Sequence, residues 1–150
     1  MTHTRHILVP VDSADESMRA LDSTFDIARR LGARVTLLRV VHDQVFVGGP
    51  AGAPVPMAQD ARAVAADARE RLQELRPRFP DDVQVDVDTA IGNDIGAAIV
   101  EHAERHAVDF IAMATHGRSG LRRLLLGSVA ESVLRHTTVP MLLYPLRDDG

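Results

Sequence analysis

Residues 7–41 read ILVPVDSADESMRALDSTFDIARRLGARVTLLRVV, and this stretch contains a complete strand–helix–strand unit. Ile7 to Val11 form a continuous apolar run, as expected of a strand buried on both faces of a parallel sheet. Ser13 and Glu16 have the spacing of a capping box, which predicts that a helix begins there. A second strand follows over Val35 to Val41.

The rest of the chain repeats this alternation of short apolar runs and longer helical periods. We expect further helices over 59–75, 94–106 and 128–136, and further strands over 83–87, 110–114 and 139–144. The Gly- and Pro-rich segment 43–57 is typical of a loop, and the alternating pattern of 83–87 favours an edge strand. Strict alternation predicts one α/β domain over 1–150, with an open five-stranded parallel sheet flanked by helices.

Composition excludes several classes of chemistry. The 150 residues include no Cys and no Lys, so disulfides, thiolate chemistry, Schiff bases and a Walker-type phosphate lysine are ruled out. A net charge of -4 and an aromatic content of 3% argue against a nucleic-acid partner. The polar start of the chain and the lack of a long apolar run predict neither a signal peptide nor a membrane span, and hence a cytoplasmic protein.

The candidate site lies where the predicted strands end. In sheets of this type, ligands bind outside the carboxyl ends of the strands. Gly117 and Gly127 enclose nine residues after the fourth strand, and Gly127-Ser128 opens the last helix, where unpaired amides and the helix dipole favour an anion. Alternatively, Ser128 and Glu131 form a capping box and Ser128 only caps its own helix. The sequence leaves both open.

The segment 113–143 resembles the C-terminal signature of the universal stress protein family. That signature is Gly, two residues, Gly, nine residues, then Gly-Ser or Gly-Thr. Here Gly117, a nine-residue spacer and Gly127-Ser128 match it, whereas Ala114 replaces the first glycine. The extra methyl is a small intrusion where φ is negative and a clash where φ is positive. The strand at 7–12 is also similar to the family's.

The resemblance implies an adenine nucleotide alpha hydrolase-like fold, with strand order 3-2-1-4-5, that binds ATP. It implies that Asp12 contacts the ribose, that Pro10 and Val40 line the adenine pocket, and that Met113 and Ala114 lie beneath the sugar. It places phosphates on Gly117, Gly127, Ser128 and Val129. Magnesium or manganese would accompany the phosphates, with Asp12 as a metal ligand.

Other polar residues have simpler alternatives. Asp12 could instead share a helix N-cap with Ser13. Arg118 could neutralise a phosphate or remain solvated. His102 and His106 lie four residues apart on one helix face, but no third ligand lies nearby in the sequence, so no zinc site is predicted.

The preferred function is an ATP-binding regulatory module of the stress response. The alternatives are a slow metal-dependent ATP hydrolase, for which no oriented general base is evident, and an interaction protein in which Ala114 has abolished nucleotide binding. The apolar strand Val139 to Leu143 is expected at a sheet edge, where it would form a homodimer with a second copy. Family members commonly dimerise in this way.

Overall fold

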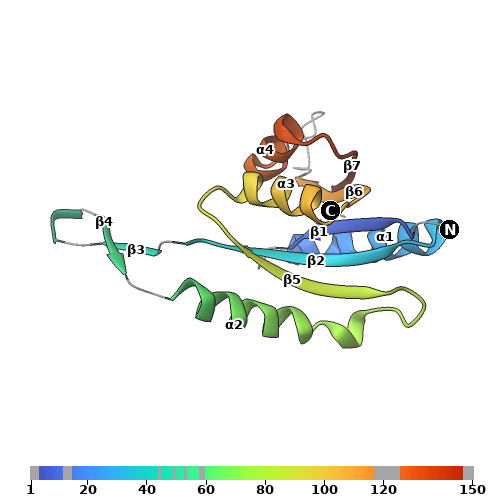
Figure 1. The fold of residues 1–150 in the computed structure, drawn as a ribbon, viewed down its shortest axis with the longest axis horizontal. Helices are drawn as coiled ribbons and strands as arrows, with labels where there is room; N and C mark the ends of the chain where they lie inside the picture. The colour runs from blue at the N-terminus through green and yellow to red at the C-terminus, as the bar shows by residue number, and fades with distance from the viewer. Residues whose placement is uncertain are drawn as a thin grey trace.

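Five parallel strands form the central sheet of the computed structural model (Figure 1). The structure describes residues 4–11, 15–43, 45–48, 50–52, 54–57, 60–116 and 126–146. The sheet has the order β5-β2-β1-β6-β7, which confirms the predicted order 3-2-1-4-5. Its strands are β1 (His6–Pro10), β2 (Arg34–Val41), β5 (Val85–Ile91), β6 (Phe110–His116) and β7 (Met141–Leu146). All four pairings between neighbours in the sheet are parallel.

Two helices cover each face of this sheet. The helices are α1 (Asp15–Leu31), α2 (Ala61–Gln73), α3 (Ile95–Arg105) and α4 (Ser128–His136), and a short 3-10 turn, η2 (Arg76–Arg78), follows α2. One core cluster joins the sheet to α1 and α2, and a second joins its other face to α3 and α4. The molecule is therefore a three-layer α/β/α sandwich, as the alternating sequence predicts.

The packing of β1 explains why its apolar run is continuous. Ile7 and Val9 are buried in the cluster under α1 and α2, whereas Leu8 is buried in the cluster under α3 and α4. Successive side chains of a strand point to opposite faces, so a strand covered on both faces needs apolar residues at every position. The same holds for β2, in which Leu37 and Leu38 belong to different clusters.

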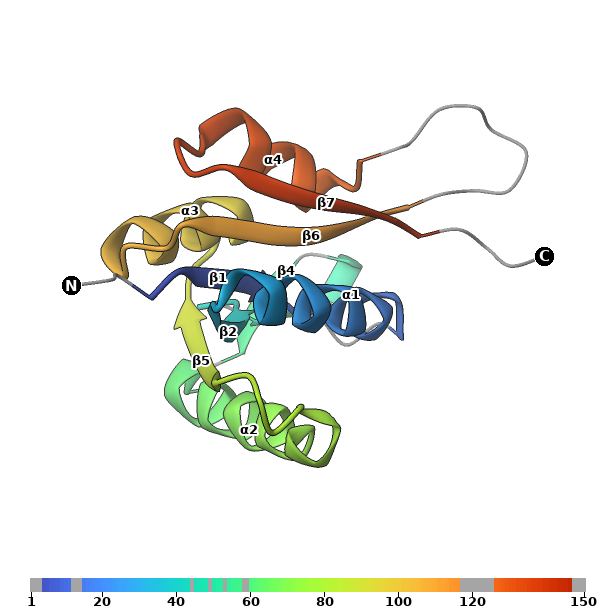
Figure 2. The ribbon, with the colours of Figure 1, turned by 90° about the vertical axis from the view of Figure 1, so that its right-hand side faces the viewer.

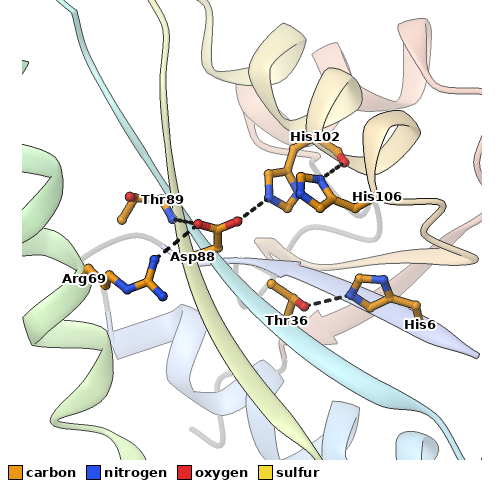
Figure 3. A network of polar contacts seen from close by, with 7 residues as sticks. All are labelled: His6, Thr36, Arg69, Asp88, Thr89, His102 and His106. Carbon is orange, nitrogen blue, oxygen red and sulfur yellow. Dashed lines mark hydrogen bonds and ion pairs between the residues drawn. The ribbon is translucent and has the colours of Figure 1, made fainter. Parts of the chain in front are cut away.

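A buried histidine begins the central strand. His6 is 3% exposed, and its Nε2 lies 2.7 Å from Thr36 Oγ1 on the neighbouring strand (Figure 3). Burial lowers the pKa of His6, and the nearby charge of Arg34 lowers it further. The imidazole is therefore kept neutral, as an interior position requires.

The segment 43–57 differs from its prediction as a loop. It contains β3 (Val45–Gly48) and β4 (Pro54–Met57), which pair antiparallel around the 3-10 turn η1 (Pro50–Gly52) and extend away from the main sheet (Figure 1). The Gly and Pro content masked the β-forming run at 45–47. Pro54 and Pro56 have no N–H group, and residues two apart in a strand face the same side. Strand β4 can therefore turn the side that lacks donors away from β3.

Most other boundaries agree with the sequence within two residues. Helix α4 spans 128–136 as predicted, and β5 lies at the edge of the sheet with only Val87 buried. Strand β7 begins at 141 rather than 139, because a turn closed by the Thr137 hydroxyl, which accepts from the Val139 amide at 2.9 Å, precedes it. Among the described residues, no helix combines the length and apolarity needed to cross a bilayer.

Candidate functional site

A cavity of about 350 Å³ opens at the carboxyl ends of β1, β2 and β6. After β1 the chain builds the sheet in one direction through β2 and β5, and then crosses to β6 on the other side of β1. The strand order therefore reverses between β1 and β6, which is where open α/β sheets bind their ligands. The cavity lies where the sequence predicted a site.

Seven of the ten residues predicted to bind nucleotide line this cavity. They come from three strand ends and from the start of α4: Pro10, Val40, Met113, Ala114, Gly127, Ser128 and Val129. The other three, Asp12, Gly117 and Arg118, lie outside the described residues. The topology thus brings together positions that are more than a hundred residues apart in the chain, such as Pro10 and Gly127.

The N-terminus of α4 faces the cavity with its own amides. Gly127 is the N-cap, with φ -62 and ψ 161, and it has no side chain with which to cap the helix. The first helical bond runs from the Glu131 amide to the Gly127 carbonyl at 2.9 Å. The amides of residues 128–130 therefore have no partner within the helix. Such amides, together with the helix dipole, form a site that accepts an anion.

The capping-box interpretation of Ser128 is wrong. Ser128 is the first residue of α4 rather than its cap, and its side chain is exposed. Gly127 has the extended backbone conformation that an N-cap requires, so the cap falls one residue earlier than the Ser128–Glu131 spacing suggests. Ser128 is one of the residues that line the cavity.

Ala114 replaces the signature glycine without backbone strain. It lies within β6, paired in register with Tyr144 of β7. In the described part of the chain, only Ala51 and Ala107 are non-glycine residues with positive φ. A negative φ suits any L-residue, so alanine does not distort the strand here. The only cost of its methyl group is a slightly narrower cavity.

The cavity has an apolar part and a polar part. Ile95 and Ile99 of α3 contribute to its lining, and the Ile99 side chain is only 1% exposed. The start of α4 brings backbone amides, which are hydrogen-bond donors, and two polar residues at the end of β2, Arg39 and His42, also line the cavity. A ligand that suits both parts has a flat apolar group and an anionic group.

Arg39 and His42 were not predicted as site residues. They belong to the strand end that the sequence points to, but the family resemblance implied only Val40 there. The pairing of β1 with β2 ends at Pro10 and Leu38, so Arg39 and Val40 lie past the end of β1 and both line the cavity. A search for cations within two residues of each strand end would have found both.

A second group of polar residues lies outside the cavity. Asp88 of β5 supplies the third potential ligand that the sequence did not place near His102 and His106, and one candidate ligand atom of each lies within 4.8 Å of the others. Asp88 precedes His102 by 14 residues and reaches it only through the packing of α3 on the sheet.

Comparison with known proteins agrees with the signature at 113–143. The model of the universal stress protein family matches residues 3–145. The universal stress protein MJ0531 of Methanocaldococcus jannaschii is 32% identical over 140 residues, which cover 93% of this chain and 81% of that protein.

Solved structures share the fold. Universal stress protein UspA from Lactobacillus plantarum has a TM-score of 0.65 at 24% identity, covering 95% of this chain and 99% of its own. A universal stress protein in complex with cAMP has a TM-score of 0.59 at 22% identity, and the match covers 95% of this chain and 97% of that one. A universal stress protein from Archaeoglobus fulgidus in complex with dAMP has a TM-score of 0.56 at 18% identity, and the match covers 95% of this chain and 98% of that one. The family match over nearly the whole chain shows that this protein belongs to the universal stress protein family.

Proposed function

We propose that this protein binds an adenine nucleotide, ATP in the first instance, in the cavity at the ends of β1, β2 and β6. The observation that carries this proposal is the uncapped N-terminus of α4, which opens into a cavity that is otherwise largely apolar. A base needs an apolar slot, and phosphates need donors that no lysine in this chain could supply. The complexes of two related proteins with cAMP and dAMP support the same ligand class.

Each predicted residue has a role in this proposal. Pro10 and Val40 hold the adenine, and Met113 and Ala114 lie beneath the ribose. The phosphates bind the residues that begin α4, Gly127, Ser128 and Val129, and Arg39, which also lines the cavity, offers a charge-assisted hydrogen bond.

The residues outside the described part complete the proposed site. Asp12 binds the ribose and, through the phosphates, a magnesium or manganese ion, while Gly117 and Arg118 bind phosphate oxygens. The protein then acts as a nucleotide-dependent regulatory module in the stress response, its surface differing between the free and bound states.

Calorimetric titration with ATP and magnesium tests the proposal. We expect saturable binding that Gly127→Val abolishes, because a branched side chain at the N-cap fills the space beside the first amides. The backbone of Gly127 is extended and accepts valine without strain. Leu134→Val is the matched control, since it places the same side chain at an exposed position of α4 outside the cavity. Absence of heat at millimolar ATP, or equal binding by Gly127→Val, contradicts the proposal.

We also propose that the protein forms a homodimer through β7. Within the described sheet, β7 pairs only with β6 and is an edge strand (Figure 2). Its Leu143 is 39% exposed. An exposed apolar edge of this kind favours pairing with a second copy. Light scattering should give a dimer for the natural protein and for Leu134→Arg, but a monomer for Leu143→Arg. A natural monomer, or a dimer with Leu143→Arg, contradicts this.

A further inference from the structure

One stripe of α3 carries two different kinds of residue. Ile95 and Ile99, in its N-terminal half, line the cavity, whereas His102 and His106 continue the same helix face toward its C-terminal end. There they approach Asp88 of β5 (Figure 3). This group, the Asp88–His102–His106 cluster, is separate from the residues that line the cavity.

The three side chains are close enough to share one ion. His102 Nε2 lies 3.0 Å from Asp88 Oδ2, and the rings of His102 and His106 are stacked with centroids 4.0 Å apart. The three candidate ligand atoms lie within 4.8 Å of one another. Zinc bonds of about 2.0–2.1 Å separate two tetrahedral ligand atoms by about 3.4 Å. The side chains therefore need to close by at most about 1.4 Å to bind one ion.

Neighbouring groups orient two of the three ligands. The other oxygen of Asp88, Oδ1, accepts from the Thr89 amide at 2.8 Å and lies 3.6 Å from Arg69 Nη1. Figure 3 shows Arg69 and the histidines on opposite sides of this carboxylate, so Oδ2 is left facing the imidazoles. Ligating carboxylates and histidines in metal sites are usually held by hydrogen bonds of this kind.

The tautomer of His106 suits a ligand. His106 Nδ1 lies 2.9 Å from the His102 carbonyl oxygen, which can only accept, so Nδ1 carries the proton. The lone pair is then on Nε2. This backbone bond is the usual way in which a protein fixes a metal-binding imidazole.

His102 lies inside the molecule. It is only 8% exposed, and in the described part of the chain its hydrogen bonding runs through Nε2 toward Asp88, because its Nδ1 has no partner there. The nitrogen that faces the carboxylate is therefore the one that would bind an ion.

We propose that Asp88, His102 and His106 bind a divalent transition-metal ion with the preferences of zinc. Two imidazoles and one carboxylate form a set of ligands that zinc accepts, and water completes the coordination on the exposed side of His106. The simpler reading is an ion pair between Asp88 and His102 that only braces α3 against β5.

Cobalt is the probe that separates these two readings. The metal-free protein, prepared with a chelator and without nucleotide, is titrated with Co²⁺ while its visible d–d absorption is followed, and Zn²⁺ is then added in competition. We expect one ion per chain with a low-coordinate cobalt spectrum. His106→Gln and Asp88→Asn should each weaken Co²⁺ binding by about tenfold or more. Working without nucleotide keeps this result independent of the function proposed above.

The chain offers a close control in His136. It is an exposed histidine near the end of α4, and its Nδ1 bonds to the carbonyl four residues earlier, Ser132 O, at 2.8 Å, just as His106 bonds to His102. His136→Gln should leave Co²⁺ affinity unchanged. The proposal is overturned if the natural protein shows no cobalt absorption, if His106→Gln binds as tightly as the natural protein, or if His136→Gln weakens binding equally. Circular dichroism of each variant confirms that it is folded.

Discussion

Helices α3 and α4 pack against each other on the same face of the sheet, yet their N-termini are built differently. At α3, the carboxylate of Asp94 caps the helix and accepts from the Ala97 amide at 3.0 Å. At α4, the cap is Gly127, which has no side chain, and the first amides face the cavity. The α2 N-terminus resembles that of α3, since Asp60 accepts from the Arg62 amide at 3.0 Å.

The difference leaves one of these N-termini more open to an anion than the others. A carboxylate at the N-cap accepts from one unpaired amide and balances the positive end of the dipole, so a second anion would be repelled. Glycine at the N-cap leaves both unsatisfied, at a cost of a few tenths of a kcal/mol in helix stability. We infer that the cap residue, more than the helix itself, decides which N-terminus binds phosphate.

The largest expected effect comes from giving α4 the kind of cap that α3 has. Gly127→Asp should abolish measurable ATP binding, a loss of about 100-fold or more, because two like charges about 4 Å apart repel by several kcal/mol near a protein surface. The same change should raise the free energy of unfolding by about 0.3–1 kcal/mol. Titration calorimetry and urea denaturation of one preparation measure both.

Gly127→Asn separates charge from size in this experiment. Asparagine caps a helix about as well as aspartate and has nearly the same shape, but it is neutral. It should therefore retain clearly more ATP affinity than Gly127→Asp. Equal losses in the two variants would mean that steric blocking alone explains the effect.

The next effect concerns the contact that holds the two helices in place. Gly96, in the first turn of α3, lies so close to α4 that an added Cβ would be 2.3 Å from Ser132 Oγ and 2.7 Å from Ser132 Cβ. The hydroxyl could rotate away, but the Cβ could not. Gly96→Ala should therefore lower the free energy of unfolding by about 1–3 kcal/mol, although alanine is the better helix former.

A second substitution tests the origin of that loss. Ser132→Gly removes both colliding atoms, so the double variant with Gly96→Ala should regain stability relative to the sum of the single changes. ATP affinity should fall in Gly96→Ala, because α3 and α4 both line the cavity. If Gly96→Ala melts like the natural protein, the two helices are packed less closely than the structure has them.

The sequence predicted the fold well because its signals are local. The continuous apolar run of β1 and the helical periods that follow it depend only on neighbouring residues, and they suffice to predict a parallel sheet. The strand ends then indicated the site, since the carboxyl ends of parallel strands meet at one edge of the sheet. The sign of φ at Ala114, by contrast, was left open by the sequence, and the structure shows that it is not positive, so glycine's conformational freedom is not required there.

What the sequence did not predict depends on contacts between distant segments. Asp88 reaches His102 only because α3 packs over β5, and Arg39 reaches the cavity only because β2 ends beside β1. The sequence left open whether Ser128 caps α4, because Ser128 and Glu131 have the spacing of a capping box, and only the backbone angles of Gly127 show that the cap is Gly127. Spacing alone does not distinguish a cap from the first residue of a helix.

The smallest expected effect comes from removing the cap of α3. Asp94→Ala removes the hydrogen bond to the Ala97 amide and should lower the free energy of unfolding by about 1 kcal/mol, measured by urea denaturation. Asp94→Asn, which keeps the cap, should restore most of this. Neither change should alter ATP affinity by more than about twofold, because Asp94 is exposed and does not line the cavity. If Asp94→Ala loses nearly as much ATP affinity as Gly127→Asp, the two N-termini do not act separately. Removing the α3 cap would then either attract the nucleotide to α3 or displace α4.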